Sequence, residues 1–284
     1  MAPNLVTGDG DLPKVVLRCG DEPGGDKAEV YLHGAHVTSW IPEATGKEMI
    51  FVSKDAIFKP PKAIRGGVPV CFPQFSDMGP LGAHGFARNS AFEVQDGESD
   101  QVTLALRPSE EDLERWPQKF ELRITVALSP GCLTQTMEVQ NMGSSAMEFT
   151  CALHTYFRVE DVTNAQVKGL RGLTYLDNLQ SRERFTEANA CVEFSGEVDR
   201  IYCGAPDTID LVDGAAGHSV VIEKTGFPDA VVWNPWVDKA ASLKDFGDEE
   251  YKEMVCIEPA VAGSDPISLD AGKMWTAVQK FMTR

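Results

Sequence analysis

The chain has 284 residues, of which 43% are hydrophobic, and its 43 acidic and 26 basic side chains give a net charge of −17. This length and composition allow a large packed core, so we expect one domain over residues 1–284. The negative charge and the lack of a basic face argue against a nucleic-acid partner. Because no apolar run reaches about 18 residues and no secretory signal pattern is visible, we expect no membrane association and a cytoplasmic location.

The seven cysteines predict reduced thiols rather than disulfides. None belongs to a Cys-x-x-Cys pair, their number is odd, and most lie within apolar segments. The lack of clustered cysteine and histidine ligands also argues against a structural zinc site, and we expect no metal. The acidic surface favours solubility and indicates no protein partner, so we expect a monomer.

Short apolar runs separated by turn residues recur from residue 28 onward. They are enriched in Val, Ile, Thr and aromatic residues, which is typical of a β-sandwich or barrel. We therefore predict an all-β fold. The predicted strands cover residues 28–41, 48–52, 91–94, 101–106, 120–128, 132–139, 148–159, 191–194, 200–202, 208–212, 219–223, 230–233, 254–257 and 275–282.

Two glycine-containing segments early in the chain each carry an arginine suited to phosphate binding. Arg65 is followed directly by Gly66 and Gly67, and Arg88 lies in the segment 82–89. A guanidinium matches two anionic oxygens, and each charge-assisted hydrogen bond contributes about 1.5–3 kcal/mol. Either arginine could instead pair with a carboxylate in an ordinary structural role. No Walker-type glycine spacing indicates a nucleotide.

Two segments between strands are predicted to be short surface helices. Residues 109–116 begin with Ser109, a suitable N-cap, and carry carboxylates in the first turn. Residues 245–252 form the second, acidic segment. We interpret their charged side chains as solvated faces rather than binding surfaces.

Two titratable side chains, His154 and Glu258, end apolar, strand-like runs about a hundred residues apart. A lone histidine in such a run is often a hydrogen-bonded core residue, and that interpretation stays open. A carboxylate directly after residues 254–257 is costly to desolvate unless a partner or a solvent-filled cleft receives it. On a rigid scaffold the two groups could be held apart as general acid and general base.

Two further residues are candidates for sugar contacts. Trp233 belongs to an aromatic and amide cluster, residues 233–236, whose indole face could lie against sugar C–H groups, although a core tryptophan is equally plausible. Asp199 could accept hydrogen bonds from hydroxyls or form a surface ion pair. His33 and His36 do not predict a metal site, because residues three apart on a strand point to opposite faces.

Five motifs together resemble one known family. They are IRGGVP (residues 64–69), HGFARN (84–89), HTYF (154–157), VWNPW (232–236) and CIEP (256–259). They occur in the order typical of the glucose-6-phosphate 1-epimerase, or hexose-6-phosphate mutarotase, branch of the aldose 1-epimerase superfamily. The resemblance spans roughly residues 28 to 282, and the combination is far more specific than any single motif.

This resemblance implies a galactose-mutarotase-like β-supersandwich of mainly antiparallel strands with a few short helices, and no cofactor. It implies an isomerase that interconverts the α and β anomers of a hexose 6-phosphate. The general acid matches His154 and the general base matches Glu258. The substrate contacts of the family match Arg65, Arg88 and Asp199, and the resemblance places His84 in the same cleft. Ala83 and Ala260 depart from the residues common in the family at those positions.

By the same resemblance, the Glu258 carboxylate removes the proton of the anomeric hydroxyl while a protonated His154 gives a proton to the ring oxygen. The C1–O5 bond opens to an aldehyde, rotation about C1–C2 presents the other carbonyl face, and reclosure gives the other anomer. Two alternatives remain: an aldose 1-epimerase for unphosphorylated sugars, and a carbohydrate-binding β-sandwich without catalysis.

Overall fold

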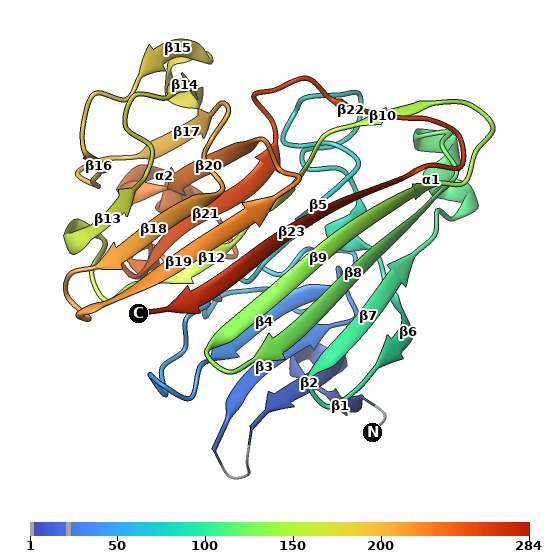
Figure 1. The fold of residues 1–284 in the computed structure, drawn as a ribbon, viewed down its shortest axis with the longest axis horizontal. Coiled ribbons are helices and arrows are strands. Elements are labelled where there is room, and N and C mark those ends of the chain that lie inside the picture. The colour runs from blue at the N-terminus through green and yellow to red at the C-terminus, as the bar shows by residue number, and fades with distance from the viewer. Residues whose placement is uncertain (1–2, 21–23) are drawn as a thin grey trace.

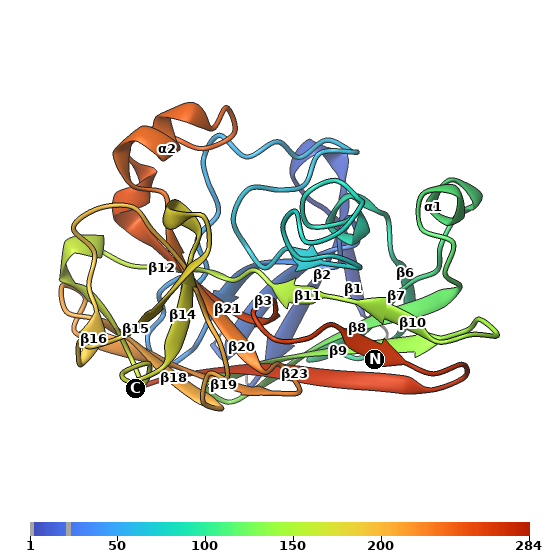
Figure 2. The same ribbon diagram turned by 90° about the horizontal axis from the view of Figure 1, so that it is seen from above.

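The computed structural model describes residues 3–20 and 24–284. Every pair of named strands in these residues is antiparallel, and the strands form two large and two small sheets (Figure 1). The predicted all-β class is confirmed. Figure 2 shows β18, β19 and β23 along one side of the molecule and α2 on the other, with β20, β21 and β12 between them.

The nine-stranded sheet has the order β16-β13-β18-β19-β23-β9-β8-β7-β6. Its strands are β6 (Glu93–Gly97), β7 (Gln101–Leu106), β8 (Phe120–Ser129), β9 (Cys132–Asn141), β13 (Ala165–Lys168), β16 (Cys191–Val192), β18 (Thr208–Asp213), β19 (His218–Thr225) and β23 (Met274–Thr283).

The eight-stranded sheet has the order β15-β14-β17-β20-β21-β11-β5, and β12 pairs with β21 beside it. Its strands are β5 (Val70–Cys71), β11 (Cys151–Leu153), β12 (Tyr156–Arg158), β14 (Thr174–Asp177), β15 (Glu183–Thr186), β17 (Val198–Tyr202), β20 (Asp229–Asn234) and β21 (Met254–Val261). The four-stranded sheet contains β1 (Asn4–Thr7), β2 (Pro13–Cys19), β3 (Asp26–Tyr31) and β4 (His36–Ile41), and β10 (Met147–Phe149) pairs with β22 (Ile267–Leu269).

One large hydrophobic cluster joins these sheets. It includes Leu17 of the four-stranded sheet, Ile257 and Phe157 of the eight-stranded sheet and Met137 and Phe281 of the nine-stranded sheet, all at most 2% exposed. The strands alternate inward and outward side chains, so each large sheet buries one face in this cluster. For the eight-stranded sheet, the other face is left for a site.

The helix predictions are right at one position and wrong at the other. α1 (Glu110–Arg115) begins at the predicted cap, where Ser109 and Asp112 form a reciprocal capping box. Residues 245–252 do not form an α-helix, and only the 3-10 helix Glu250–Glu253 occurs there. The Glu250 carboxylate instead accepts hydrogen bonds from distant groups, including the Ser53 hydroxyl and the Lys54 N–H, and this tertiary bonding overrides the local preference. The second α-helix, α2 (Trp236–Ser242), was not predicted.

A buried carboxylate at the start of β20 ties this strand to the loop after β21. Asp229, fully buried, accepts hydrogen bonds from the N–H groups of Gly204 and residues 262–264 and from the Ser264 hydroxyl. Asp229→Ala leaves these donors without an acceptor, so we expect the free energy of unfolding to fall by about 3–5 kcal/mol in urea titrations. The exposed Asp96→Ala should change it by less than about 0.5 kcal/mol, and an equally small loss at Asp229 would contradict this prediction.

Candidate active site

The two titratable side chains at the ends of separate apolar runs meet across one pair of strands. β11 pairs with β21 with Cys151 opposite Val261, and the same register resumes between β12 and β21. Continuing it through the break between β11 and β12 places His154 opposite Glu258, and opposed residues have Cβ atoms about 4.5–5.5 Å apart. His154 Nδ1 lies 3.4 Å from Glu258 Oε1. The predicted separation of the two groups is therefore wrong, because strand pairing makes them direct neighbours.

Alternation along the strands decides which side chains share this face of the sheet. Because residues two apart and directly opposed residues point the same way, Tyr156 and Cys256 lie on the same side as the His154–Glu258 pair. Residues that alternate with them on these strands and on the neighbouring β20 point into the main core. These are Leu153, Phe157, Val232, Val255 and Ile257. One face of the sheet is therefore structural and the other carries the polar groups.

A cavity of about 360 Å³ opens on the polar face. All seven residues that the sequence proposed for the site line it, namely Arg65, His84, Arg88, His154, Asp199, Trp233 and Glu258. They come from β17, β20, β21, the break between β11 and β12, two loops of the first hundred residues and the 3-10 helix Ala87–Asn89, which carries Arg88. Folding thus collects in one place side chains up to 193 positions apart in the chain, from Arg65 to Glu258.

Several lining residues were missed by the sequence analysis. Tyr156, Asn178 and Lys239 bring polar groups to the cavity, and Phe75, Ser76, Ala83, Val231 and Leu243 complete the lining. Tyr156 had a signal, since it stands two residues after His154 in the same motif and therefore shares its face. Lys239 had none, because it projects from α2, which the sequence did not predict.

Arg65 is held at the cavity by two partners. Its Nε donates to Asp245 Oδ1 at 3.2 Å, and its Nη1 donates to the Tyr156 hydroxyl at 3.3 Å. The following glycines have positive φ angles, 101° for Gly66 and 66° for Gly67, and a Cβ at Gly67 would collide with the His36 ring. Only glycine allows this left-handed, close-packed turn, which directs Arg65 into the cavity.

Arg88 has fewer hydrogen-bond and ion-pair partners than Arg65. Its Nη2 donates to the Ala83 carbonyl at 3.1 Å, while its buried Nε has no hydrogen-bond partner. Within residues 3–20 and 24–284, no carboxylate forms an ion pair with it. The structural interpretation of an arginine paired with a carboxylate thus holds for Arg65 and not for Arg88. Arg88 is the cation best able to receive an anion.

His84 has a defined tautomer. The N–H of Ser76 donates to His84 Nδ1 at 3.2 Å, so in the neutral ring the proton is on Nε2. Burial, followed by the charges of Arg88 and Arg65, lowers the pKa of His84 to about 3. The ring packs edge-on against His154 with centroids 5.5 Å apart. His84 is therefore a neutral hydrogen-bond donor beside the central pair.

Asp199 and Trp233 form one wall of the site. They are directly opposed in β17 and β20. Asp199 accepts a hydrogen bond of 2.6 Å from Asn178 Nδ2, and burial raises its pKa. Trp233 is 9% exposed and packs edge-on against His154 at 5.9 Å and Tyr156 at 5.8 Å. Its indole therefore contributes both to packing and to the lining.

Burial moves the two central pKa values in opposite directions. The pKa of His154 lies well below its ordinary value because of burial and the nearby His84, Arg88 and Arg65. Burial raises the pKa of Glu258 well above its ordinary value, and Asp199 adds to the rise. His154 Nδ1 and Glu258 Oε2 have no hydrogen-bond partner. Both shifts favour the uncharged form of the group concerned, because both groups are poorly solvated.

Comparison with known proteins agrees with this geometry. The chain matches the aldose 1-epimerase family over residues 20–282. The chain belongs to the aldose 1-epimerase family. The resemblance inferred from the five motifs is confirmed.

Individual relatives extend this family match. A protein of Cenchrus ciliaris, provisionally named glucose-6-phosphate 1-epimerase, is 46% identical over 95% of this chain and 84% of its own length. An Escherichia coli protein with the same provisional name is 34% identical over 83% of this chain and 80% of its own length. A Salmonella typhimurium crystal structure, provisionally described as a mutarotase, superposes with a TM-score of 0.87 and 28% identity, covering 99% of this chain and 93% of that one. The predicted mutarotase-like fold is confirmed.

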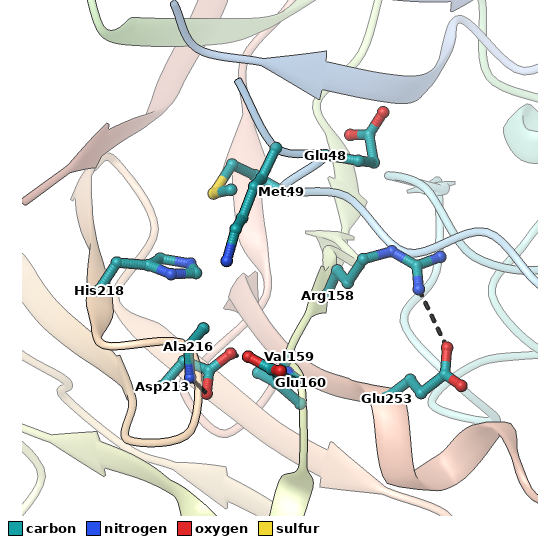
Figure 3. A pocket seen from close by; sticks show the side chains of 10 residues that line it. Glu48, Met49, Arg158, Val159, Glu160, Asp213, Ala216, His218 and Glu253 are labelled. Carbon is teal, nitrogen blue, oxygen red and sulfur yellow. Dashed lines mark hydrogen bonds and ion pairs between the residues drawn. The ribbon is translucent and has the colours of Figure 1, made fainter. Parts of the chain in front are cut away.

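A second cavity, of about 420 Å³, contains none of the predicted residues (Figure 3). Its lining includes Arg158 and His218. Two of its acidic groups have partners: Glu253 pairs with Arg158 at 3.0 Å, and Asp213 accepts the Glu160 N–H at 2.8 Å. No acid–base pair comparable to His154 and Glu258 lies among the described residues that line it.

Among the described residues, no helix has the length and apolar character needed to cross a bilayer.

Proposed function

We propose that this protein is a hexose-6-phosphate mutarotase, with glucose 6-phosphate as a substrate. The observation that carries the proposal is the His154–Glu258 pair, 3.4 Å apart, in a cavity that also contains Arg65 and Arg88. The family match and the names of the two relatives support it. Buried acid and base groups in contact, with cations beside them, suit proton transfer on an anionic sugar.

In the proposed reaction, Glu258 takes the proton of the O1 hydroxyl and His154 gives its proton to O5. The O1 electrons form the carbonyl as the C1–O5 bond breaks, and rotation followed by the reverse transfers gives the other anomer. O1 and O5 are both bonded to C1, so an acid and a base that are neighbours can reach both atoms. The net transfer moves one proton between the two groups, and no further reactant is needed.

The phosphate and the proton transfer are linked in this proposal. Arg88 and Arg65 are among the charges that lower the pKa of His154. A phosphate dianion bound between them offsets those charges and so favours the protonated imidazole that the ring opening requires. A sugar without phosphate lacks this effect, which gives a physical reason for phosphorylated substrates.

The proposal is tested by exchange NMR of the anomeric signals of glucose 6-phosphate. We expect the protein to raise the α–β exchange rate well above the spontaneous rate, with positioned acid and base groups each contributing about 10²–10⁴. Mannose and galactose 6-phosphates extend the test to the substrate class. No acceleration with any of the three would overturn the proposed activity.

The pH dependence follows from the two opposed pKa shifts. A histidine with the ordinary pKa of 6.5 and a glutamate with the ordinary pKa of 4.5 would together carry one proton mainly between pH 4.5 and pH 6.5. The rate would then fall about tenfold by about pH 7.5. A lowered His154 pKa and a raised Glu258 pKa widen the one-proton range on both sides. We therefore expect kcat at about pH 7.5 to lie within about twofold of kcat at about pH 5.5.

This profile is measured with saturating glucose 6-phosphate and chelator-treated protein, after subtraction of the spontaneous rate. Saturation matters because the substrate phosphate itself titrates near about pH 6. A maximum close to pH 5.5 followed by a tenfold loss by about pH 7.5 would show that burial does not shift the pair as we infer.

One observation favours an alternative substrate class. Asp245 already pairs with Arg65, with Nη2 to Oδ1 at 3.1 Å, and so offsets one of the two charges assigned to the phosphate. An aldose 1-epimerase for unphosphorylated sugars would use the same His154–Glu258 pair without needing either arginine. Substitutions of the two arginines distinguish the two substrates.

We also propose that the enzyme acts in the cytoplasm as a monomeric single domain of residues 1–284 and needs no cofactor for turnover. All seven cysteines are free thiols, which suits a reducing compartment. The net charge of −17 opposes association with polyanions and favours solubility.

A further inference from the structure

Three possible metal ligands converge at the floor of the active site. A ring nitrogen of His154, the sulfur of Cys256 and a carboxylate oxygen of Glu258 all lie within 4.8 Å of one another. Cys256 and Glu258 are two residues apart on β21 and so share a face, and His154 lies across the strand pair from Glu258. All three residues are at most 8% exposed.

The spacing suits a tetrahedral ion. Zinc bonds of about 2.0–2.3 Å at tetrahedral angles place neighbouring ligand atoms about 3.3–3.6 Å apart. His154 Nδ1 and Glu258 Oε1 are 3.4 Å apart and make no hydrogen bond with each other. The Cys256 sulfur would need to approach by at most about 1.5 Å, within the reach of a side-chain adjustment. The cavity leaves a fourth position open to water.

The electrostatics also suit a divalent cation. His154 Nδ1 and Glu258 Oε2 are buried without a hydrogen-bond partner, which is an unfavourable state that metal coordination would relieve. Binding releases the Cys256 thiol proton and any proton on Glu258 to solvent. The resulting thiolate and carboxylate then balance the two positive charges of the ion, so the buried complex has no net charge.

We propose that His154, Cys256 and Glu258 form a site for a thiophilic divalent cation, represented by Zn²⁺, and that the bound ion reversibly inhibits the enzyme. The mixed nitrogen, sulfur and oxygen set selects zinc over magnesium or calcium. The ion occupies both groups of the proton-transfer pair, so binding and turnover exclude each other. The inhibitory consequence rests on the proposed mutarotase activity, whereas the binding itself does not.

Binding is tested first without activity. The full chain, treated with chelator and dialysed under reducing conditions, is titrated with Co²⁺ as a spectroscopic probe, and Zn²⁺ is then added as competitor. We expect one Co²⁺ per chain, a thiolate-to-metal charge-transfer band and loss of that band on adding Zn²⁺. Cys256→Ser should abolish the band. Cys71→Ser is the matched control, because this thiol is equally buried in the same sheet but is outside the trio.

Inhibition is tested on the same proteins by exchange NMR. Each variant is compared with its own metal-free exchange rate, and in Cys256→Ser the Zn²⁺ concentration for half inhibition should rise by at least about tenfold. Cys71→Ser should leave that concentration unchanged. Absence of the charge-transfer band in the unsubstituted protein, or equal zinc inhibition of Cys256→Ser, would overturn the site. A normal band without any catalysed exchange would instead refute the proposed function and leave the metal site standing.

Discussion

His154→Ala and Glu258→Gln are each expected to slow the catalysed exchange of glucose 6-phosphate anomers by about 10²–10⁴. The first removes the group that protonates O5, and the second replaces a carboxyl by an amide of the same shape that cannot accept the O1 proton. Because the two act on one proton, the double variant should lose little more than the worse single variant. Exchange NMR with enzyme at known concentration measures all three.

His218→Ala and Glu253→Gln are the matched controls, because both residues line the second cavity and neither touches the active site. They should leave the exchange rate within about twofold. Circular dichroism and urea titration of each variant separate loss of chemistry from loss of fold. Full activity of both folded active-site variants would eliminate the acid–base mechanism. Absence of catalysed exchange in the unsubstituted protein would instead favour the carbohydrate-binding alternative.

Arg88→Ala is expected to lower kcat/KM for glucose 6-phosphate by about 10- to 100-fold and to leave kcat/KM for glucose within about twofold. Arg88 has no carboxylate partner among the described residues, and the loss of one charge-assisted hydrogen bond to phosphate costs about 1.5–3 kcal/mol. Arg158→Ala, in the second cavity, serves as the control for removal of a guanidinium and should affect neither substrate.

Arg65→Ala adds a sharper test, because it leaves the Asp245 carboxylate without its partner beside the phosphate. We expect a loss for glucose 6-phosphate at least as large as that of Arg88→Ala, and partial recovery when Asp245→Ala is added. A structural role for Arg65 alone would reduce turnover of both sugars equally and give no recovery. Equal losses for glucose and glucose 6-phosphate in both arginine variants would favour the unphosphorylated substrate.

Much of the fold could be predicted because strand signals are local. The pattern of residues 120–139 anticipates β8 and β9, and Ser109 with Asp112 anticipates the cap of α1. The strands before residue 20 and between 165 and 186 were not predicted. The four-residue strands among them, β1, β13, β14 and β15, depend on pairing with neighbours rather than on their own sequence. α2 and the loop at 245–252 were misjudged for a related reason. The Asn234 amide donates to the distant Tyr251 and Met254 carbonyls and Glu250 accepts from Ser53, and the fold decides where these partners lie.

The sequence alone was enough to indicate the family and seven of the residues that line the cavity, because motifs and the alternation of faces along a strand depend on neighbouring positions in the chain. The sequence could not predict that His154 and Glu258 are in contact, because this depends on the register of strands about a hundred residues apart. The same holds for the partner of Arg65, the contribution of Lys239, the opposed pKa shifts and the trio completed by Cys256. All of these arise from contacts between distant segments and from burial, which exist only once the sheets have packed.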